Sequence, residues 1–235
     1  MPVLPGLPAV EITLRRSARA RRFSLRVSRL DGRVTLSLPL RAREAEAMAF
    51  LRDQEGWIRQ ALASVAPSAV VGIGTLLPVE GARLVLRPGT GRLVRVEGDS
   101  LLVPGDPARV GTRVAAFLQV RARDRLAAAC DRHAAALGRP YSRLTLRDTR
   151  SRWGSCTSDG ALMFSWRLIL APPEVLDYVA AHEVAHLAEM NHSPAFWAVV
   201  ARLCPGYTPR RAWLKRHGQA LHAFRFDAGA EGQGD

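Results

Sequence analysis

The sequence is poor in several features that define particular protein classes. Its three cysteines, Cys130, Cys156 and Cys204, form no Cys-x-x-Cys pair, so a zinc ribbon is excluded and a disulfide framework is disfavoured. No apolar run reaches the roughly 18 residues of a transmembrane helix, and residues 1–9 lack the basic start and apolar core of a signal peptide. We therefore expect a cytoplasmic protein with no membrane partner.

Lysine is almost absent, although basic residues are plentiful. The chain has 34 basic and 21 acidic residues, a net charge of +13, and Lys215 is the only lysine. A general preference for arginine explains this composition more simply than an acidic partner, because the arginines are spread along the chain. A nucleotide or nucleic-acid partner bound through the arginine-rich surface stays open, since arginine binds phosphate groups bidentately.

Residues 1–104 are expected to form an N-terminal β-rich domain that contains one helix. Alternating apolar and polar residues predict that the first three strands pair as an antiparallel meander. Five arginines between residues 15 and 22 mark its first hairpin, either as a solvated end or as a surface for an acidic partner. The expected strands are 10–16, 23–28, 34–38, 70–79, 83–87, 93–97 and 101–103, with the helix at 41–65.

Residues 105–226 are expected to form a second domain, which makes the protein an α+β fold. A long amphipathic helix is predicted at 108–137, because Gly138 follows it as a helix stop. Strand candidates at 142–148 and 162–170 then predict a small antiparallel sheet, before Pro173 begins another helix. Residues 227–235, rich in glycine, alanine and acid, are expected to be a disordered tail.

The helix from Pro173 carries the pattern that indicates chemistry. His182 and His186 are four residues apart, so on a helix they share one face, and Glu183 lies beside the first. Two neutral imidazoles so placed can bind one Zn²⁺, while the glutamate can act as general base on a zinc-activated water. The pattern is typical of a zinc hydrolase.

A catalytic zinc ion needs a third protein ligand. After His186 the only acids are Glu189, Asp227, Glu231 and Asp235, so the glutamate that some zinc peptidases carry on a later helix is missing. His192 is the best-placed histidine, because Asn191 can end one helix and Ser193-Pro194 can begin the next. His217 and His222 remain alternatives. Glu189 stands where metzincins need glycine, and no methionine follows Met190, so that class is disfavoured.

Several residues are candidates for binding the substrate. Tyr207, Arg210, Arg211 and His217 could donate to the oxyanion of a tetrahedral intermediate. The strand before the zinc helix could be an exposed edge that pairs with an extended peptide, which would place Trp153, Gly154, Ser155 and Cys156 in the wall of the cleft. Arg152, just before them, is a further candidate for binding the substrate. Simple core packing is the alternative for the tryptophans.

Four stretches together resemble the YgjP-like metallopeptidases, which are related to the SprT and WLM proteases. They are 152–156 (RWGSC), 166–168 (WRL), 182–186 (HEVAH) and 191–197 (NHSPAFW). The resemblance implies a zincin-like catalytic domain, one zinc ion on His182, His186 and His192, and Glu183 as base. It leaves the substrate open, because a nucleotide pyrophosphatase activity has also been attributed to that family.

Three functional classes follow from these observations. A zinc peptidase that acts on polypeptides is favoured, because the motif helix, a third histidine and a possible substrate-pairing strand occur together. A metal-dependent hydrolase of nucleoside triphosphates is the second class, since arginines could contact phosphates. A nucleic-acid-associated protein with a structural metal is the third, although it would have no need of Glu183. The sequence does not indicate an oligomeric state.

Overall fold

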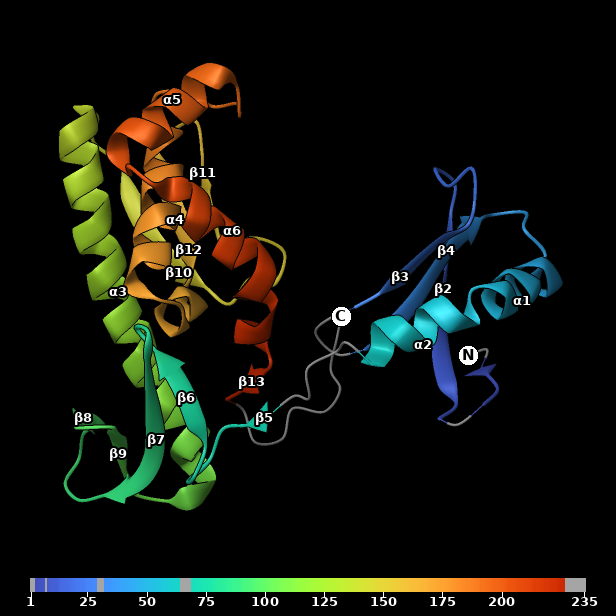
Figure 1. The fold of residues 1–235 in the computed structure, drawn as a ribbon, viewed down its shortest axis with the longest axis horizontal. Coiled ribbons are helices and arrows are strands. Elements are labelled where there is room, and N and C mark those ends of the chain that lie inside the picture. Colours follow the sequence, from blue (N-terminus) through green and yellow to red (C-terminus); the bar gives the residue numbers. More distant parts are fainter. Residues whose placement is uncertain (1–2, 7, 29–31, 64–68, 227–235) are drawn as a thin grey trace. The chain divides into compact units, whose positions relative to one another are not determined.

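The computed structural model describes residues 3–6, 8–28, 32–63 and 69–226. The fold is mixed α+β, as expected, and divides between Ser68 and Ala69 into two compact units that are described separately here (Figure 1). Of the regions predicted above, the tail at 227–235 lies outside the described residues. No helix in the described ranges has the length and apolarity needed to cross a membrane; the cellular compartment stays a prediction.

The N-terminal unit contains a four-stranded sheet in the order β1-β2-β4-β3. Strand β4 lies between β2 and β3, parallel to β2 and antiparallel to β3, so the predicted meander is wrong. Every second residue of β4 is buried, whereas no residue of β3 is, and the more apolar strand therefore takes the central position. The strands are Val3–Leu4 (β1), Val10–Ser17 (β2), Ser24–Val27 (β3) and Val34–Pro39 (β4).

The helix predicted at 41–65 is two helices, Glu44–Asp53 (α1) and Glu55–Ala63 (α2), separated at Gln54. Their apolar faces cover the sheet: Leu51 and Ile58 are buried in one cluster with Ile12 and Leu36. This cluster is the core of the N-terminal unit.

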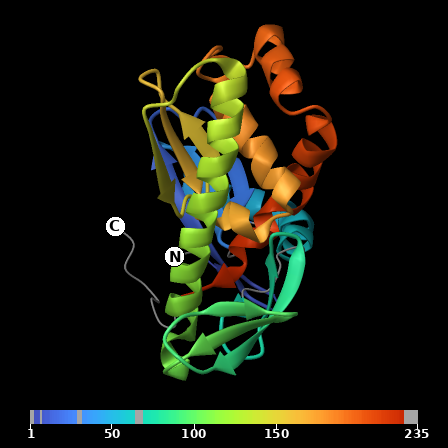
Figure 2. The same cartoon turned by 90° about the vertical axis from the view of Figure 1, so that its left-hand side faces the viewer.

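The second unit is built along helix α3, Val110–Leu137, which follows a short 3₁₀ turn at Pro107–Arg109 (η1). It ends at Gly138 in a left-handed conformation with φ of 73°, which confirms the predicted stop. One end of α3 lies beside strands β6 to β9 and the other beside α4 (Figures 1 and 2). One continuous buried face of α3, which includes Val114, Leu118 and Leu126, packs against the elements at both ends.

Strands β6 to β9 form a second four-stranded sheet, in the order β6-β7-β9-β8. The expected domain boundary near 104 differs from the contact division, which groups residues 69–104 with the second unit. The reason is a shared core, since Leu86 and Leu101 are buried in the same cluster as Leu118. The strands are Leu76–Val79 (β6), Ala82–Gly89 (β7), Arg95–Glu97 (β8) and Ser100–Pro104 (β9). Strand β5, Ala69–Val70, pairs instead with β13, Phe224–Arg225.

A three-stranded sheet lies next to the motif helix, in the order β10-β12-β11. It consists of Arg143–Arg147 (β10), Gly154–Cys156 (β11) and Ala161–Ser165 (β12). The prediction of an antiparallel sheet is only half right, because β10 runs parallel to β12 and only β11 is antiparallel. The strand predicted at 162–170 ends at Ser165 and continues as the 3₁₀ turn Trp166–Leu170 (η2). Strand β12 is therefore central, and β10 and β11 are the edge strands.

Three helices complete the unit: Pro173–Ala185 (α4), Pro194–Leu203 (α5) and Tyr207–His217 (α6). A last 3₁₀ turn, Gly218–His222 (η3), leads to β13. Helix α4 is enclosed by α3, α5, α6 and strand β11, so any chemistry on α4 has an apolar setting.

Candidate metal centre

Helix α4 begins where the sequence signals a start and positions two histidines. Pro173 is its first residue, and Glu174 lies in the first turn, where the helix dipole favours negative charge. Val175, Val179 and Val184 are buried. Because this helix is packed on nearly all sides, His182 and Glu183 are held in fixed positions.

The helix ends earlier than the predicted turn at Asn191. His186 is already its C-cap. Beyond it, the backbone amides of Leu187 and Glu189 donate hydrogen bonds to the carbonyls of Val184 and Ala185, each closing a single turn. The early end lets His186 Nδ1 donate to the carbonyl of Glu189 at 2.9 Å. This hydrogen bond orients the ring and leaves Nε2 as the free nitrogen.

His192 lies in the corner between α4 and α5. The side chain of Asn191 accepts a hydrogen bond from the amide of Ser193 at 3.2 Å, and Ser193 Oγ accepts from the amide of Phe196 at 3.3 Å. Ser193 is therefore the N-cap of α5 and Pro194 its first residue, as predicted. The corner turns His192 back towards α4.

The structure brings together His182, His186 and His192, whose ligand nitrogens lie within 4.8 Å of one another; this group contains neither His217 nor His222. The Nε2 atoms of His182 and His192 are 3.1 Å apart. Two ligands of a tetrahedral zinc ion, each at about 2.0–2.1 Å, would be about 3.3 Å apart. The spacing of this pair suits two ligands of one ion, and with His186 the group could hold a metal ion.

His182 and His186 are also in the protonation state that a metal requires. Burial, together with the neighbouring His186 and His192, lowers the pKa of His182 to about 3. Burial likewise lowers the pKa of His186. Both rings are neutral at physiological pH and can offer a lone pair without first losing a proton.

Glu183 is the acidic residue of this centre, and it is only 5% exposed. Burial raises the pKa of its carboxyl to about 8, while the positive charge of Arg152 acts in the opposite direction. A bound cation would favour the ionised form further. A carboxyl poised near neutrality in an apolar site is suited to take up and release a proton.

Gly154, on edge strand β11, lies directly against Glu183. A Cβ atom at this position would be 2.6 Å from Cγ and Oε1 of Glu183. Only glycine leaves the carboxylate its space, so the candidate residue Gly154 borders the carboxylate of Glu183. Neither periodicity nor spacing in the sequence could have revealed this contact.

Aromatic rings enclose the histidines on the side of α5 and α6. Phe196 stacks on His186 with ring centroids 4.4 Å apart, and Tyr207 stacks on Trp197 at 5.5 Å. The guanidinium of Arg211 covers the ring of Trp197 at 4.4 Å. Tyr207 and Arg211, two of the proposed oxyanion donors, are thereby held in the layer that borders the centre.

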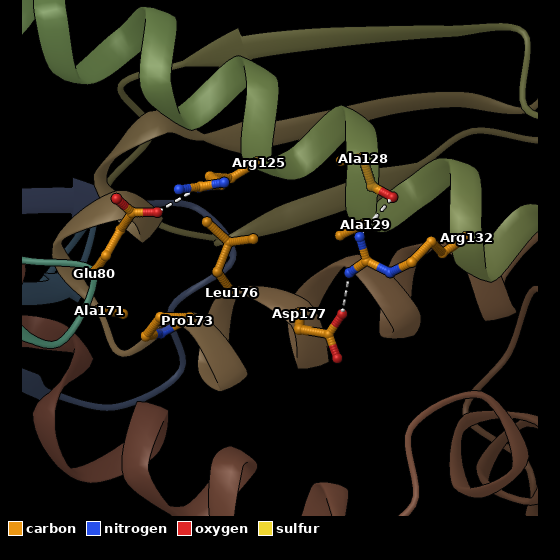
Figure 3. Close-up of a pocket in the computed structure, with 9 residues that line it drawn as sticks. All are labelled: Glu80, Arg125, Ala128, Ala129, Arg132, Ala171, Pro173, Leu176 and Asp177. Atoms are coloured by element: carbon orange, nitrogen blue, oxygen red, sulfur yellow. Dashed lines mark hydrogen bonds and ion pairs between the residues drawn. The ribbon is translucent and has the colours of Figure 1, made fainter.

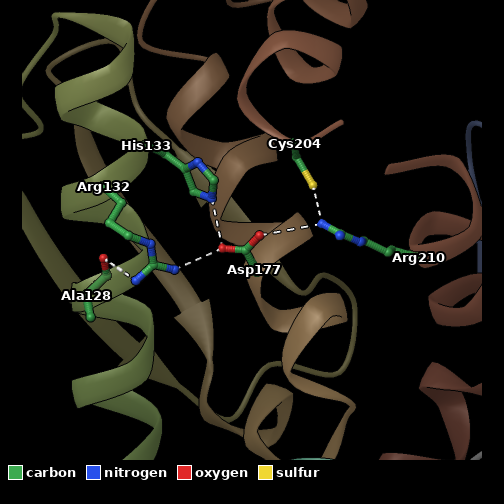
Figure 4. Close-up of polar contacts among 6 residues, drawn as sticks. All are labelled: Ala128, Arg132, His133, Asp177, Cys204 and Arg210. Atoms are coloured by element: carbon green, nitrogen blue, oxygen red, sulfur yellow. Dashed lines mark hydrogen bonds and ion pairs between the residues drawn. The ribbon is translucent and has the colours of Figure 1, made fainter. Parts of the chain in front are cut away.

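Arg210 is placed differently from its neighbour Arg211. Its guanidinium donates to Cys204 Sγ at 2.8 Å and lies 3.6 Å from the carboxylate of Asp177 (Figure 4). Asp177 also accepts hydrogen bonds from His133 at 3.0 Å and Arg132 at 3.1 Å. This network joins α3, α4 and α6, so Arg210 as placed here ties helices together. The sequence analysis missed the network, because its members are far apart in the chain.

Trp153 is likewise engaged in packing. Its ring stacks on His222 with centroids 4.9 Å apart, and Gly218 lies close beneath it. The alternative of core packing, which was left open above, describes this contact. His222 therefore packs against Trp153 and is not part of the histidine group.

A cavity of about 290 Å³ lies between α3 and the start of α4 (Figure 3). Alanine, proline and leucine side chains form part of its lining, and Glu80 and Asp177 are paired with arginines at its margin. None of the three clustered histidines lines it, so this cavity is separate from the metal centre.

Comparisons with known proteins agree with these observations. A family model described as "YgjP-like, metallopeptidase domain" matches residues 21–217. Among curated proteins no sequence matches. Among solved structures, one is the metallopeptidase zymogen of Pyrococcus abyssi abylysin, with 20% identity, a TM-score of 0.35, and 38% of this chain and 93% of that chain covered. The family match spans both units of the fold.

Proposed function

Because the chain belongs to the YgjP-like metallopeptidase family, we propose that it is a zinc-dependent peptidase that hydrolyses polypeptides with Glu183 as general base. The observation that carries this proposal is the convergence of three imidazoles next to one buried carboxyl. A structural metal site would have no use for Glu183, whose burial is costly unless it serves a reaction.

His182, His186 and His192 would hold the zinc ion. When bound, zinc polarises a carbonyl oxygen and makes water more acidic, to a pKa of about 7. Glu183 accepts the proton of the attacking water and passes it to the leaving amine. Packing of Phe196 and Trp197 excludes bulk water from one side, which strengthens the electrostatic interactions within the site.

Strand β11 supplies a place for the substrate backbone. It is an edge strand of its sheet and carries Gly154 against Glu183. The main chain of an extended peptide that pairs with this edge would run alongside the carboxylate of Glu183, as in other cases of strand addition. Of the two neighbouring arginines Arg210 and Arg211, the second is exposed and stacked on Trp197. Arg211 is the better candidate to contact the substrate, since Arg210 is engaged by Asp177 and Cys204.

The deciding experiment offers the zinc-loaded protein an unfolded polypeptide and, separately, nucleoside triphosphates. We expect the polypeptide to be cleaved and the triphosphates to remain intact. Glu183→Gln is the matched control, because it keeps the shape of the side chain and removes the base. Hydrolysis of triphosphates alone, lost in the same variant, would assign the site to the nucleotide class instead.

A further inference from the structure

The outer face of the three-stranded sheet carries a groove of about 390 Å³. Three arginines and five hydroxyl side chains line it, and among the described residues its lining contains no carboxylate and no aromatic ring. The arginines are Arg143 and Arg147 from β10 and Arg152 from the loop before β11. We call these lining residues the basic groove.

The arginines of the basic groove have donors to spare. Several other arginines of this unit are paired with carboxylates: Arg125 with Glu80, for example, and Arg167 with Asp148. In the groove, Arg143 has one long contact of 3.9 Å, to exposed Asp159. Within the described part of the chain, Arg147 and Arg152 make no side-chain hydrogen bond or ion pair. Like charges gathered with few counter-ions attract an anionic ligand.

Strand β11 connects the basic groove with the metal centre. Side chains alternate along a strand, so Gly154 faces Glu183 on the inner side while Ser155 lines the groove on the outer side. Arg152 lines the groove only two residues before Gly154. A polypeptide paired with the edge of β11 would direct every second side chain towards the groove.

We propose that the basic groove binds acidic side chains of the substrate, so that the enzyme selects polypeptide segments rich in aspartate and glutamate. This inference rests on the proposed peptidase function and adds the substrate class. Arginine binds carboxylates bidentately, and the hydroxyl groups supply further donors. A nucleic acid fits less well, because the groove has no aromatic side chain on which a base could stack.

The first test measures kcat/KM for three peptides that are identical except for Glu, Gln or Lys at the residues flanking the scissile bond. Exposed ion pairs are worth about twofold each, so three arginines should favour the Glu peptide over the Gln peptide by roughly tenfold. The preference should shrink at high salt. Arg143→Gln/Arg147→Gln should reduce the ratio, whereas Arg83→Gln/Arg87→Gln, which removes two exposed arginines on β7 with the same loss of charge, should not.

The second test separates binding from catalysis. Zinc-loaded Glu183→Gln protein is titrated with a fluorescent acidic peptide and, separately, with a single-stranded oligonucleotide. We expect the peptide to bind, and Arg147→Glu to weaken its binding, because the net charge of the groove's side chains then falls from three positive charges to one. If no peptide is cleaved in the first test but the acidic peptide still binds the groove, the peptidase proposal fails and the assignment of the groove stands.

Equal kcat/KM for Glu and Gln peptides would overturn the proposal, as would a preference that the groove variants leave unchanged. Tight binding of the oligonucleotide, lost in Arg143→Gln/Arg147→Gln, together with no binding of the acidic peptide, would also overturn it. That pattern would assign the groove to nucleic acid.

Discussion

Gly154→Ala should inactivate the enzyme while leaving the metal in place. The new methyl group would be 2.6 Å from Cγ and Oε1 of Glu183, against 3.4–4 Å for ordinary contact. The carboxylate must therefore move by about 1 Å, and a misplacement of that size can cost on the order of 100-fold in rate. Crowding in a packed site should also lower the unfolding free energy by about 1–3 kcal/mol.

The assay compares kcat on an unfolded polypeptide with zinc content and urea unfolding of the same preparation. Gly72→Ala is the control, because a Cβ there meets nothing within 4 Å. We expect full zinc content and about a 100-fold lower kcat for Gly154→Ala, with both unchanged in Gly72→Ala. Parental kcat in Gly154→Ala would refute the placement of Glu183 against β11.

Three further predictions concern the centre and its support. Glu183→Gln should retain zinc and lose hydrolysis, as measured by metal analysis and peptide cleavage; unchanged turnover would remove Glu183 as base. Removal of zinc by a chelator should lower the unfolding free energy by about 4 kcal/mol relative to protein in zinc at a thousandfold excess over Kd. A melting temperature that does not change with zinc concentration would count against a bound ion. Asp177→Asn should destabilise the fold by about 2 kcal/mol. Because the hydrogen bond from His133, followed by that from Arg132, lowers the pKa of Asp177 from 3.8, this stability exists above that pH and is lost on acidification below it. Urea unfolding between pH 5 and 3 should thus be less pH-dependent in the variant, and an equal slope in both proteins would show that Asp177 does not contribute.

Local signals in the sequence predicted the elements that carry the site. Gly138 ends α3, Pro173 begins α4, and Ser193-Pro194 begins α5, because each signal acts on its own helix end. The spacing of His182, His186 and His192 then placed three imidazoles in one group. Such short-range features depend little on the rest of the fold.

Contacts between segments that are distant in the sequence were not predicted correctly. The central position of β4, the parallel pairing of β10 with β12, and the union of residues 69–104 with α3 depend on contacts between distant segments. Propensity and alternation indicate that a strand exists but not which neighbour it chooses. The contact of Gly154 with Glu183 and the partners of Arg210 belong to the same class.

The central claim is that His182, His186 and His192 hold one zinc ion. Metal analysis of purified parental protein and His192→Ala, side by side, tests it most directly, with His217→Ala as the control for loss of an exposed histidine outside the group. We predict about one zinc ion per chain in the parental protein and in His217→Ala, and far less in His192→Ala. Full zinc content in His192→Ala would contradict the account.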